Sequence, residues 1–144
     1  MKIYLDNCCF NRQFDDQSQL RIKMETEAIT GIQEYILKNK LKLVWSYMLD
    51  YENYMNPFEE RKISIEQWQK LAEIDVEENA VIKHNANKYA GIGLKTKDSI
   101  HIVCAVYANC NYFFTTDDKV LNKAAFVKEI AICNPIDFIK EFQK

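Results

Sequence analysis

The chain opens with Lys2-Ile3-Tyr4-Leu5-Asp6-Asn7, a short run of β-favouring residues that ends in a carboxylate. Its isoleucine and tyrosine fit the pleated surface of a strand, so the run predicts a first strand with Asp6 at its carboxyl end. In an open parallel α/β sheet, ligands bind in the crevice outside the carboxyl ends of the strands. Asp6 is therefore predicted to face the place where such a protein does its chemistry.

A second strand-like run, late in the chain, also leads into acids. Residues Asn111–Thr116 are rich in aromatic and β-branched side chains and run into Asp117-Asp118. Between the two runs, Ser46–Glu52 and Lys97–His101 open helical patterns that each place one more acid within the first turns. Two strands and two helix starts are thus predicted to bring carboxylates to one edge of a sheet.

The remaining sequence alternates between strand-like runs and helical patterns. A polar loop is predicted over residues 7–17, and Ser18 is predicted to cap a long helix that Asn39 and Lys40 end. The helix has an apolar face at Leu20, Met24, Ala28, Ile29, Ile32, Ile36 and Leu37. Further strands are predicted at 41–45, 74–76, 111–115 and 130–133, and further helices at 47–55, 58–72, 77–89, 97–109, 118–126 and 135–142. This alternation indicates parallel βαβ units, with the apolar helix 97–109 buried at the centre of one domain spanning residues 1–144.

Composition excludes several classes of protein. Hydrophobic residues make up 48% and charged residues 28% of the 144, which argues against intrinsic disorder. No apolar run approaches the roughly 20 residues that span a bilayer, and the start has no signal-peptide pattern. The net charge of −2 gives no strongly basic total, although a local basic patch could be hidden in that sum.

Cysteine and glycine usage narrows the classes further. Five cysteines without paired spacing suit reduced thiols in a cytoplasmic protein, and zinc is not expected because the chain has no Cys-x-x-Cys and only two histidines. Cys8 and Cys9 are interpreted as small buried fillers rather than nucleophiles. With three glycines, neither a Walker A loop nor a Gly-x-Gly-x-x-Gly turn can be formed.

An acidic crevice without a phosphate-cradling loop favours a nuclease over a nucleotide-binding enzyme. Four carboxylates in one crevice repel one another and raise their pKa values unless a divalent cation lies among them. Oxygen ligands point to magnesium or manganese. Such ions activate a water molecule and stabilise the attacking and leaving oxygens in phosphodiester cleavage.

The acids lie in four motifs that resemble the PIN domain, the fold of metal-dependent ribonucleases that includes the VapC-type toxins. The motifs are Tyr4-Leu5-Asp6, a serine followed by a helical glutamate in Ser46–Glu52, the Asp-(Ala/Ser)-x-His helix start in Lys97–His101, and Thr-x-Asp in Thr115–Asp117. They occur in family order and span nearly the whole chain. The resemblance departs at Asn7-Cys8-Cys9, where many members carry a threonine or serine after the first aspartate.

The resemblance implies an α/β fold, a three-layer α/β/α sandwich with a central parallel sheet. It also implies a magnesium or manganese site, with catalytic and metal-binding roles for Asp6, Glu52, Asp98 and Asp117. The implied activity is a metal-dependent endoribonuclease that hydrolyses RNA, the toxin of a toxin–antitoxin pair. The implied partners are an RNA substrate and an antitoxin protein, with a homodimer as an open option and no membrane.

Two other functions compete with this one. A PIN-like module without catalysis could bind RNA or a protein partner, but the presence of all four acids weighs against it. A response-regulator receiver has paired acids after its first strand, and a haloacid-dehalogenase-type phosphatase has an Asp-x-Asp motif. The chain has Asp6-Asn7-Cys8-Cys9 at this position, which fits neither.

Neighbouring acids compete for two of the four positions. Asp50 and Glu52 fall on different faces of a helix, and only Glu52 fits the spacing from Ser46. Asp118 is interpreted as a helix-start acid rather than a metal ligand beside Asp117.

Other polar residues near the motifs are given secondary roles. Glu27 is interpreted as structural, and His101 as a buried histidine that holds the start of its helix. Asn11 and Arg12 are candidates for substrate phosphate contact. The lysines near Asp98 are candidates for the RNA backbone: Lys83, Lys88, Lys95 and Lys97.

Overall fold

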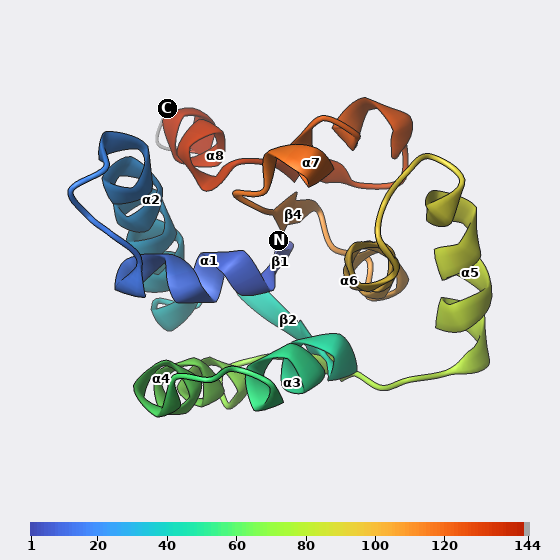
Figure 1. Cartoon of the computed structure of the whole chain (residues 1–144), viewed down its shortest axis with the longest axis horizontal. Coiled ribbons are helices and arrows are strands. Elements are labelled where there is room, and N and C mark those ends of the chain that lie inside the picture. The colour runs from blue at the N-terminus through green and yellow to red at the C-terminus, as the bar shows by residue number, and fades with distance from the viewer. Residues whose placement is uncertain (143–144) are drawn as a thin grey trace.

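Five parallel strands form the centre of the structure, a computed structural model that describes residues 1–142 (Figure 1). They are β1 (Lys2–Leu5), β2 (Lys42–Ser46), β3 (Ile74–Val76), β4 (Tyr112–Phe114) and β5 (Ala131–Cys133), in the order β3-β2-β1-β4-β5. β2 and β3 lie on one side of β1 in the sheet, and β4 and β5, which come later in the chain, lie on its other side. The topological switch point therefore lies between β1 and β4, where a ligand crevice is expected.

Helices cover both faces of this sheet. Their bounds are α1 Asn7–Asn11, α2 Leu20–Leu37, α3 Tyr47–Tyr54, α4 Glu59–Gln69, α5 Ala80–Ala90, α6 Thr96–Tyr107, α7 Asp118–Leu121 and α8 Pro135–Phe142, with short 3-10 helices η1 (Arg12–Phe14) and η2 (Ala124–Phe126). In Figure 1, α2 and α8 lie on one side of the strands, and α5 and α6 lie on the other. The predicted three-layer α/β/α sandwich with a central parallel sheet is confirmed.

Alternate strand residues pack against the two helical layers. The ring of Tyr4 stacks on Phe113 with centroids 5.4 Å apart and meets His101 of α6. On the other face, Tyr112 and Phe114 contact the ring of Phe138 in α8. Most of α6 from Ser99 to Ala105 is buried, so the prediction of a buried central helix is also confirmed.

The structure corrects the prediction of a loop over residues 7–17. α1 begins directly after β1, because the Asp6 carboxylate accepts a hydrogen bond from the Asn7 amide and so caps a helix there. Ser18 does not cap α2, which begins at Leu20, and its hydroxyl instead donates to Asp16. The apolar face of α2 is also narrower than predicted, because Leu20, Met24 and Leu37 are exposed.

Other boundaries follow the sequence pattern more closely. Ser46 caps α3 by accepting a hydrogen bond from the Leu49 amide at 3.4 Å, as its position predicts. The segment predicted as one helix over 118–126 is divided into α7 and η2. Within residues 1–142, no helix combines the length and the apolar character that a bilayer crossing requires.

Candidate metal centre

The four predicted acids line one open cavity of about 300 Å³. Asp6 follows β1 and Asp117 follows the neighbouring strand β4, while Glu52 comes from α3 and Asp98 from the first turn of α6. The other lining residues are Asn7, Cys8, Asn11 and Asp15. The cavity therefore lies at the switch point of the sheet, where two adjacent strands and two helices each contribute a carboxylate.

Asp6 is held between the two strand ends. Its backbone amide donates to the Phe114 carbonyl at 2.9 Å, and its Oδ2 accepts a hydrogen bond from the Thr115 hydroxyl at 2.8 Å. Burial raises the pKa of Asp6, while His101 and the hydrogen bond from Thr115 act against that rise. The carboxylate is thus fixed in position, but its charged form is poorly compensated there.

Asp98 shows the electrostatic cost of bringing the acids together. Burial, followed by repulsion from Asp6 and Asp117, raises its pKa to about 6. A carboxylate at such a place favours either a proton or a cation as its neighbour. The cavity is therefore electrostatically suited to a divalent cation.

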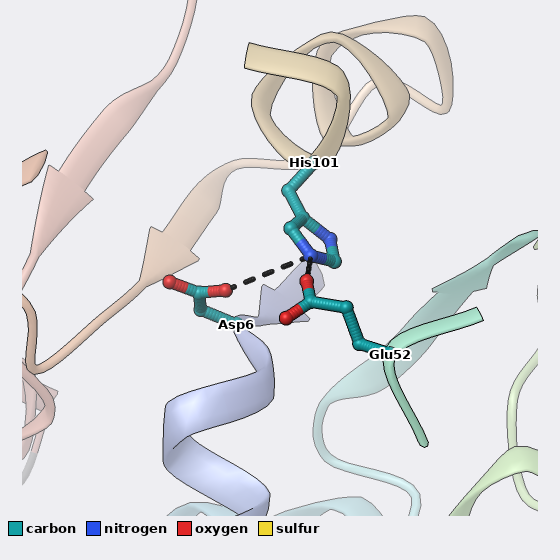
Figure 2. Close-up of side chains that lie close together, drawn as sticks. All are labelled: Asp6, Glu52 and His101. Atoms are coloured by element: carbon teal, nitrogen blue, oxygen red, sulfur yellow. Dashed lines mark hydrogen bonds and ion pairs between the residues drawn. The ribbon is translucent and has the colours of Figure 1, made fainter. Parts of the chain in front are cut away.

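Glu52 is held by a chain of buried hydrogen bonds that begins at Ser46. The Tyr4 hydroxyl lies 2.6 Å from Ser46 Oγ and 2.6 Å from His101 Nδ1. The other ring nitrogen of His101 bonds to Glu52 Oε1 (Figure 2). Since Ser46 Oγ accepts from the Leu49 amide, Ser46 can donate to Tyr4, Tyr4 to Nδ1 and Nε2–H to the carboxylate. Every donor then has an acceptor, and His101 orients Glu52.

Asp6, Glu52 and His101 form a group whose candidate ligand atoms all lie within 4.8 Å of one another (Figure 2). Nε2 of His101 is 3.9 Å from Asp6 Oδ1. In the arrangement in which Nδ1 accepts from Tyr4, Nε2 carries the proton and donates to Glu52, so it is not a metal ligand. The available ligands are then carboxylate oxygens, which suit magnesium or manganese, with the histidine supporting one of them.

A turn after β4 places Asp117 beside this group. The Asp117 amide donates to Thr115 Oγ1 at 3.1 Å, and the carboxylate caps α7 by accepting from the Lys119 amide at 2.9 Å. Thr115 thus contacts both Asp6 and Asp117. The first aspartate is followed by Asn7 and Cys8 and not by a threonine or serine, but the hydroxyl of Thr115, directly after β4, lies 3.5 Å from Cys8 Sγ.

Cys8 is not the buried filler that was predicted. It lines the cavity, half-buried, with its sulfur 3.5 Å from Thr115 Oγ1 and 3.7 Å from Asp6 Oδ2, because α1 starts early and turns it over the strand ends. Cys9 is buried, as predicted. That neither is a nucleophile stays a prediction.

The rival acids lie elsewhere. Asp50 points away from the cavity and accepts a hydrogen bond from the Trp45 ring nitrogen at 2.8 Å. Asp118 is exposed and forms a two-pronged ion pair with Arg21, at 2.8 and 2.9 Å. Glu27 is exposed on α2 and does not line the cavity.

The sequence interpretation overlooked Glu25, which is fully buried beside the site. Its carboxylate pairs with Arg12 at 3.3 Å and Arg21 at 3.2 Å and accepts a hydrogen bond from Asn134 at 2.6 Å. Its spacing from Ile29 and Ile32 places it on the buried face of α2, a signal that could have identified it.

Most of the basic residues that are candidates for phosphate or RNA contact are paired with other residues of the protein. Arg12 also donates to Thr116 Oγ1 at 2.7 Å and pairs with Asp15, so its guanidinium is tied into the protein rather than free for phosphate. Lys83 and Lys88 pair with glutamates, Glu78 and Glu129. Lys97 is exposed and lies over the ring of Tyr51 at 5.2 Å.

No protein-family model and no curated protein sequence matches the chain. Solved structures do match. VapBC2 from Rickettsia felis, crystallised with a DNA fragment from its promoter, superposes with a TM-score of 0.62 at 13% identity, over 93% of this chain and 98% of that one.

Two further structures agree. FitAcB from Neisseria gonorrhoeae has a TM-score of 0.59 at 15% identity, over 92% of this chain and 97% of that one. VapBC-1 from nontypeable Haemophilus influenzae has a TM-score of 0.59 at 16% identity, over 94% and 98%. The similarity covers nearly the whole chain in each case, and the chain has the PIN-like, VapC-like fold that its four motifs predict.

Proposed function

We propose that this protein is a metal-dependent endoribonuclease, the toxin of a toxin–antitoxin pair, acting in the cytoplasm. The observation that carries the proposal is the single cavity at the switch point between β1 and β4, lined by Asp6, Glu52, Asp98 and Asp117. An acidic cavity of this kind, in a PIN-like fold and without a phosphate-cradling loop, suits hydrolysis of a phosphodiester bond.

Magnesium or manganese would be held by these four carboxylates. When bound, the ion supplies a water molecule activated for attack and stabilises charge on the phosphodiester oxygens. The chain's own contribution is to fix the ligands. Thr115 holds Asp6 and the turn before Asp117, and His101 holds Glu52, so the oxygens stay in place without having to be ordered by substrate.

The test is cleavage of single-stranded and structured RNA by the purified protein. Cleavage is expected only with magnesium or manganese, and a chelator should stop it. Undiminished cleavage in excess chelator would refute the metal mechanism. RNA binding without cleavage, under conditions where the protein also binds magnesium, would favour the catalytically silent module instead.

The solved structures with this fold include complexes designated VapBC and FitAcB, which supports an antitoxin protein as the partner of this chain. A small neighbouring gene for a DNA-binding protein would be the first place to look. Co-expression should then yield a complex in which cleavage is suppressed. The mass of the free chain in solution will decide whether it forms a homodimer.

A further inference from the structure

A second groove, of about 340 Å³, opens from the acidic cavity onto α3 and α4. The two share the lining residues Asn7, Asn11 and Glu52. The remaining lining residues of this groove are Met55, Asn56, Pro57, Phe58, Arg61 and Lys97. A chain molecule bound in the groove would therefore continue directly into the cavity.

The groove differs in charge from the cavity that it joins. Its lining contains two cations, Arg61 and Lys97, and Glu52 is its one acid. No ion pair of Lys97 is found among residues 1–142, and its ammonium lies over the Tyr51 ring. Arg61 is held by the Phe14 carbonyl at 3.0 Å and by Asp15 at 3.4 Å. Positive charge thus stands next to carboxylates that would otherwise repel a polyanion.

The groove also presents an exposed aromatic ring and side-chain amides. Phe58 is 56% exposed, and one face of its ring carries the Arg61 guanidinium 4.6 Å from the centroid. Asn7, Asn11 and Asn56 also line the groove. Their amides form a short network, in which Asn56 donates to Asn11 Oδ1 at 3.2 Å and Asn11 donates to the Asn7 carbonyl at 3.1 Å, and each amide keeps hydrogen-bonding positions that these bonds do not use. Rings, amides and cations in one groove match the base faces, base edges and phosphates of a single strand.

We propose that this groove is a subsite for unpaired RNA flanking the bond to be cleaved. One base stacks on Phe58, the positions that the asparagine amides leave unused meet its edge, and Lys97 meets a backbone phosphate, with the positive charge of Arg61 lying in the same groove. The inference rests on the proposed ribonuclease function and adds to it a requirement for an unstacked nucleotide on this side of the site. A duplex cannot meet that requirement, because its bases are stacked on one another.

An RNA strand suits the groove better than a protein segment does. The apolar lining is limited to Met55, Pro57 and Phe58, and the rest is amide or charged. A protein segment would need to bring acids to Lys97 and Arg61 while leaving the neighbouring carboxylates unopposed. A phosphate backbone that contacts these basic side chains can continue into the acidic cavity. The proposed cleavage needs the next phosphate of the strand to lie there, beside the metal ion.

The experiment measures binding of a short fluorescein-labelled oligouridylate by anisotropy, with Ca²⁺ in place of Mg²⁺ and the RNA checked for integrity. Phe58→Ala should weaken binding roughly tenfold or more, as expected for loss of one base–aromatic stack. Phe58→Leu, which keeps the apolar bulk, should weaken it nearly as much. Lys97→Ala should weaken it less and reduce the salt slope by about 0.7, the share of one phosphate contact on a single strand.

The chain offers a matched control in η2. Phe126 is 62% exposed and carries Lys123 over its ring at 5.9 Å, but η2 packs against β5 at the far edge of the sheet from β2 and α3. Phe126→Ala and Lys123→Ala should bind the oligouridylate like wild type. Duplex RNA should bind Phe58→Ala and wild type alike.

Cleavage kinetics separate the proposal of the RNA subsite from the proposal of the ribonuclease function. Phe58→Ala should raise KM for the single strand with little change in kcat. If the protein cleaves RNA but Phe58→Ala and Lys97→Ala match their controls in affinity and KM, the subsite is wrong, the ribonuclease stands, and the groove is left to a protein partner. If the variants lose affinity as expected but no form of the protein cleaves, the groove is an RNA-binding site, and both the ribonuclease and the position of the groove beside a bond to be cleaved are wrong. Failure of wild type to bind the strand overturns the subsite outright.

Discussion

Two polar clusters, one around a buried glutamate and one around a partly exposed group of acids, lie near the carboxyl ends of the strands, and their carboxylates are compensated differently. In the first, Glu25 is fully buried but is paired with Arg12 and Arg21 and hydrogen-bonded by Asn134. In the second, Asp6, Glu52, Asp98 and Asp117 share one cavity whose lining contains no lysine or arginine. Basic side chains thus neutralise the carboxylate of the first cluster but not those of the second.

This difference indicates that the acids of the cavity lack a neutralising cation. Buried carboxylates are retained when they are paired or coordinate a metal. The charge of Glu25 is compensated by two arginines of the protein, which also reach the turn after β4: Arg12 bonds to Thr116 Oγ1 and Arg21 to the Thr116 carbonyl. The acids of the cavity have no such cation in their lining. Their unbalanced charge is what a divalent cation would neutralise.

The adjacent acids Asp117 and Asp118 belong to different clusters and give the sharpest comparison. Asp117→Asn should reduce RNA cleavage by more than the roughly 10- to 100-fold typical of residues that only support a ligand. Asp118→Asn removes part of an exposed ion pair with Arg21 and should retain much of the activity. Initial rates under identical magnesium concentrations measure both. Equal losses would mean that the Thr-x-Asp motif has been assigned to the wrong aspartate.

Glu25→Ala should cause the largest loss of stability. It removes the buried partner of Arg12, which keeps only the partly exposed Asp15 as an ion pair, and it removes the acceptor of Asn134. A cost of about 3 kcal/mol is therefore expected from breaking a buried pair. Urea unfolding measures it, with exposed Glu27→Ala on the same helix as the control, expected to change stability by about 0.5 kcal/mol or less. If the two variants unfolded alike, Glu25 would not be the anchor of its cluster.

Tyr4→Phe tests whether the Ser46–Tyr4–His101 chain serves Glu52. Without the hydroxyl, His101 loses its Nδ1 donor and can turn or change tautomer, so magnesium affinity should fall about tenfold. Isothermal titration measures the affinity. Tyr112→Phe, in the same sheet, is the control.

A purely structural role for the Tyr4 hydroxyl predicts a different result. Stability would then fall, by about 1 to 3 kcal/mol for the polar groups left unpaired, while magnesium affinity would stay unchanged. The affinity measurement therefore separates positioning of Glu52 from packing.

The order of strands and helices could be predicted because it rests on local patterns. β3 was placed at Ile74–Val76 from three residues of sequence, and α8 at Pro135–Phe142 from a proline and a short apolar pattern. The meeting of Asp6 and Asp117 followed from one rule, that the ends of parallel strands share an edge. The predicted roles of the four acids remain proposals.

What the sequence missed depends on contacts between distant segments. The Tyr4–His101 hydrogen bond joins residues 97 positions apart, and no periodicity reports it. The early start of α1 depends on the Asp6 carboxylate, which caps the helix as well as facing the cavity, and the strand pattern of residues 2–6 does not indicate that second role. A carboxylate that caps a helix through one oxygen, Oδ1, and meets Thr115 through Oδ2 can do both.

The smallest expected effect concerns the stability of the metal-free cavity, where Asp6→Asn should melt at or above the wild-type temperature. The reason is that Asp6 is buried among other acids, while an asparagine can still accept the Asn7 hydrogen bond without adding charge. The gain is on the order of 1 kcal/mol, about 2 to 8 °C. With magnesium the order should reverse, because a ligand that binds the folded state stabilises only the protein that retains its site. Thermal melts of both proteins, each with and without magnesium, measure this. A mutant clearly less stable without metal, and gaining as much from magnesium as wild type, would make Asp6 a structural acceptor and leave the four-carboxylate site untenable.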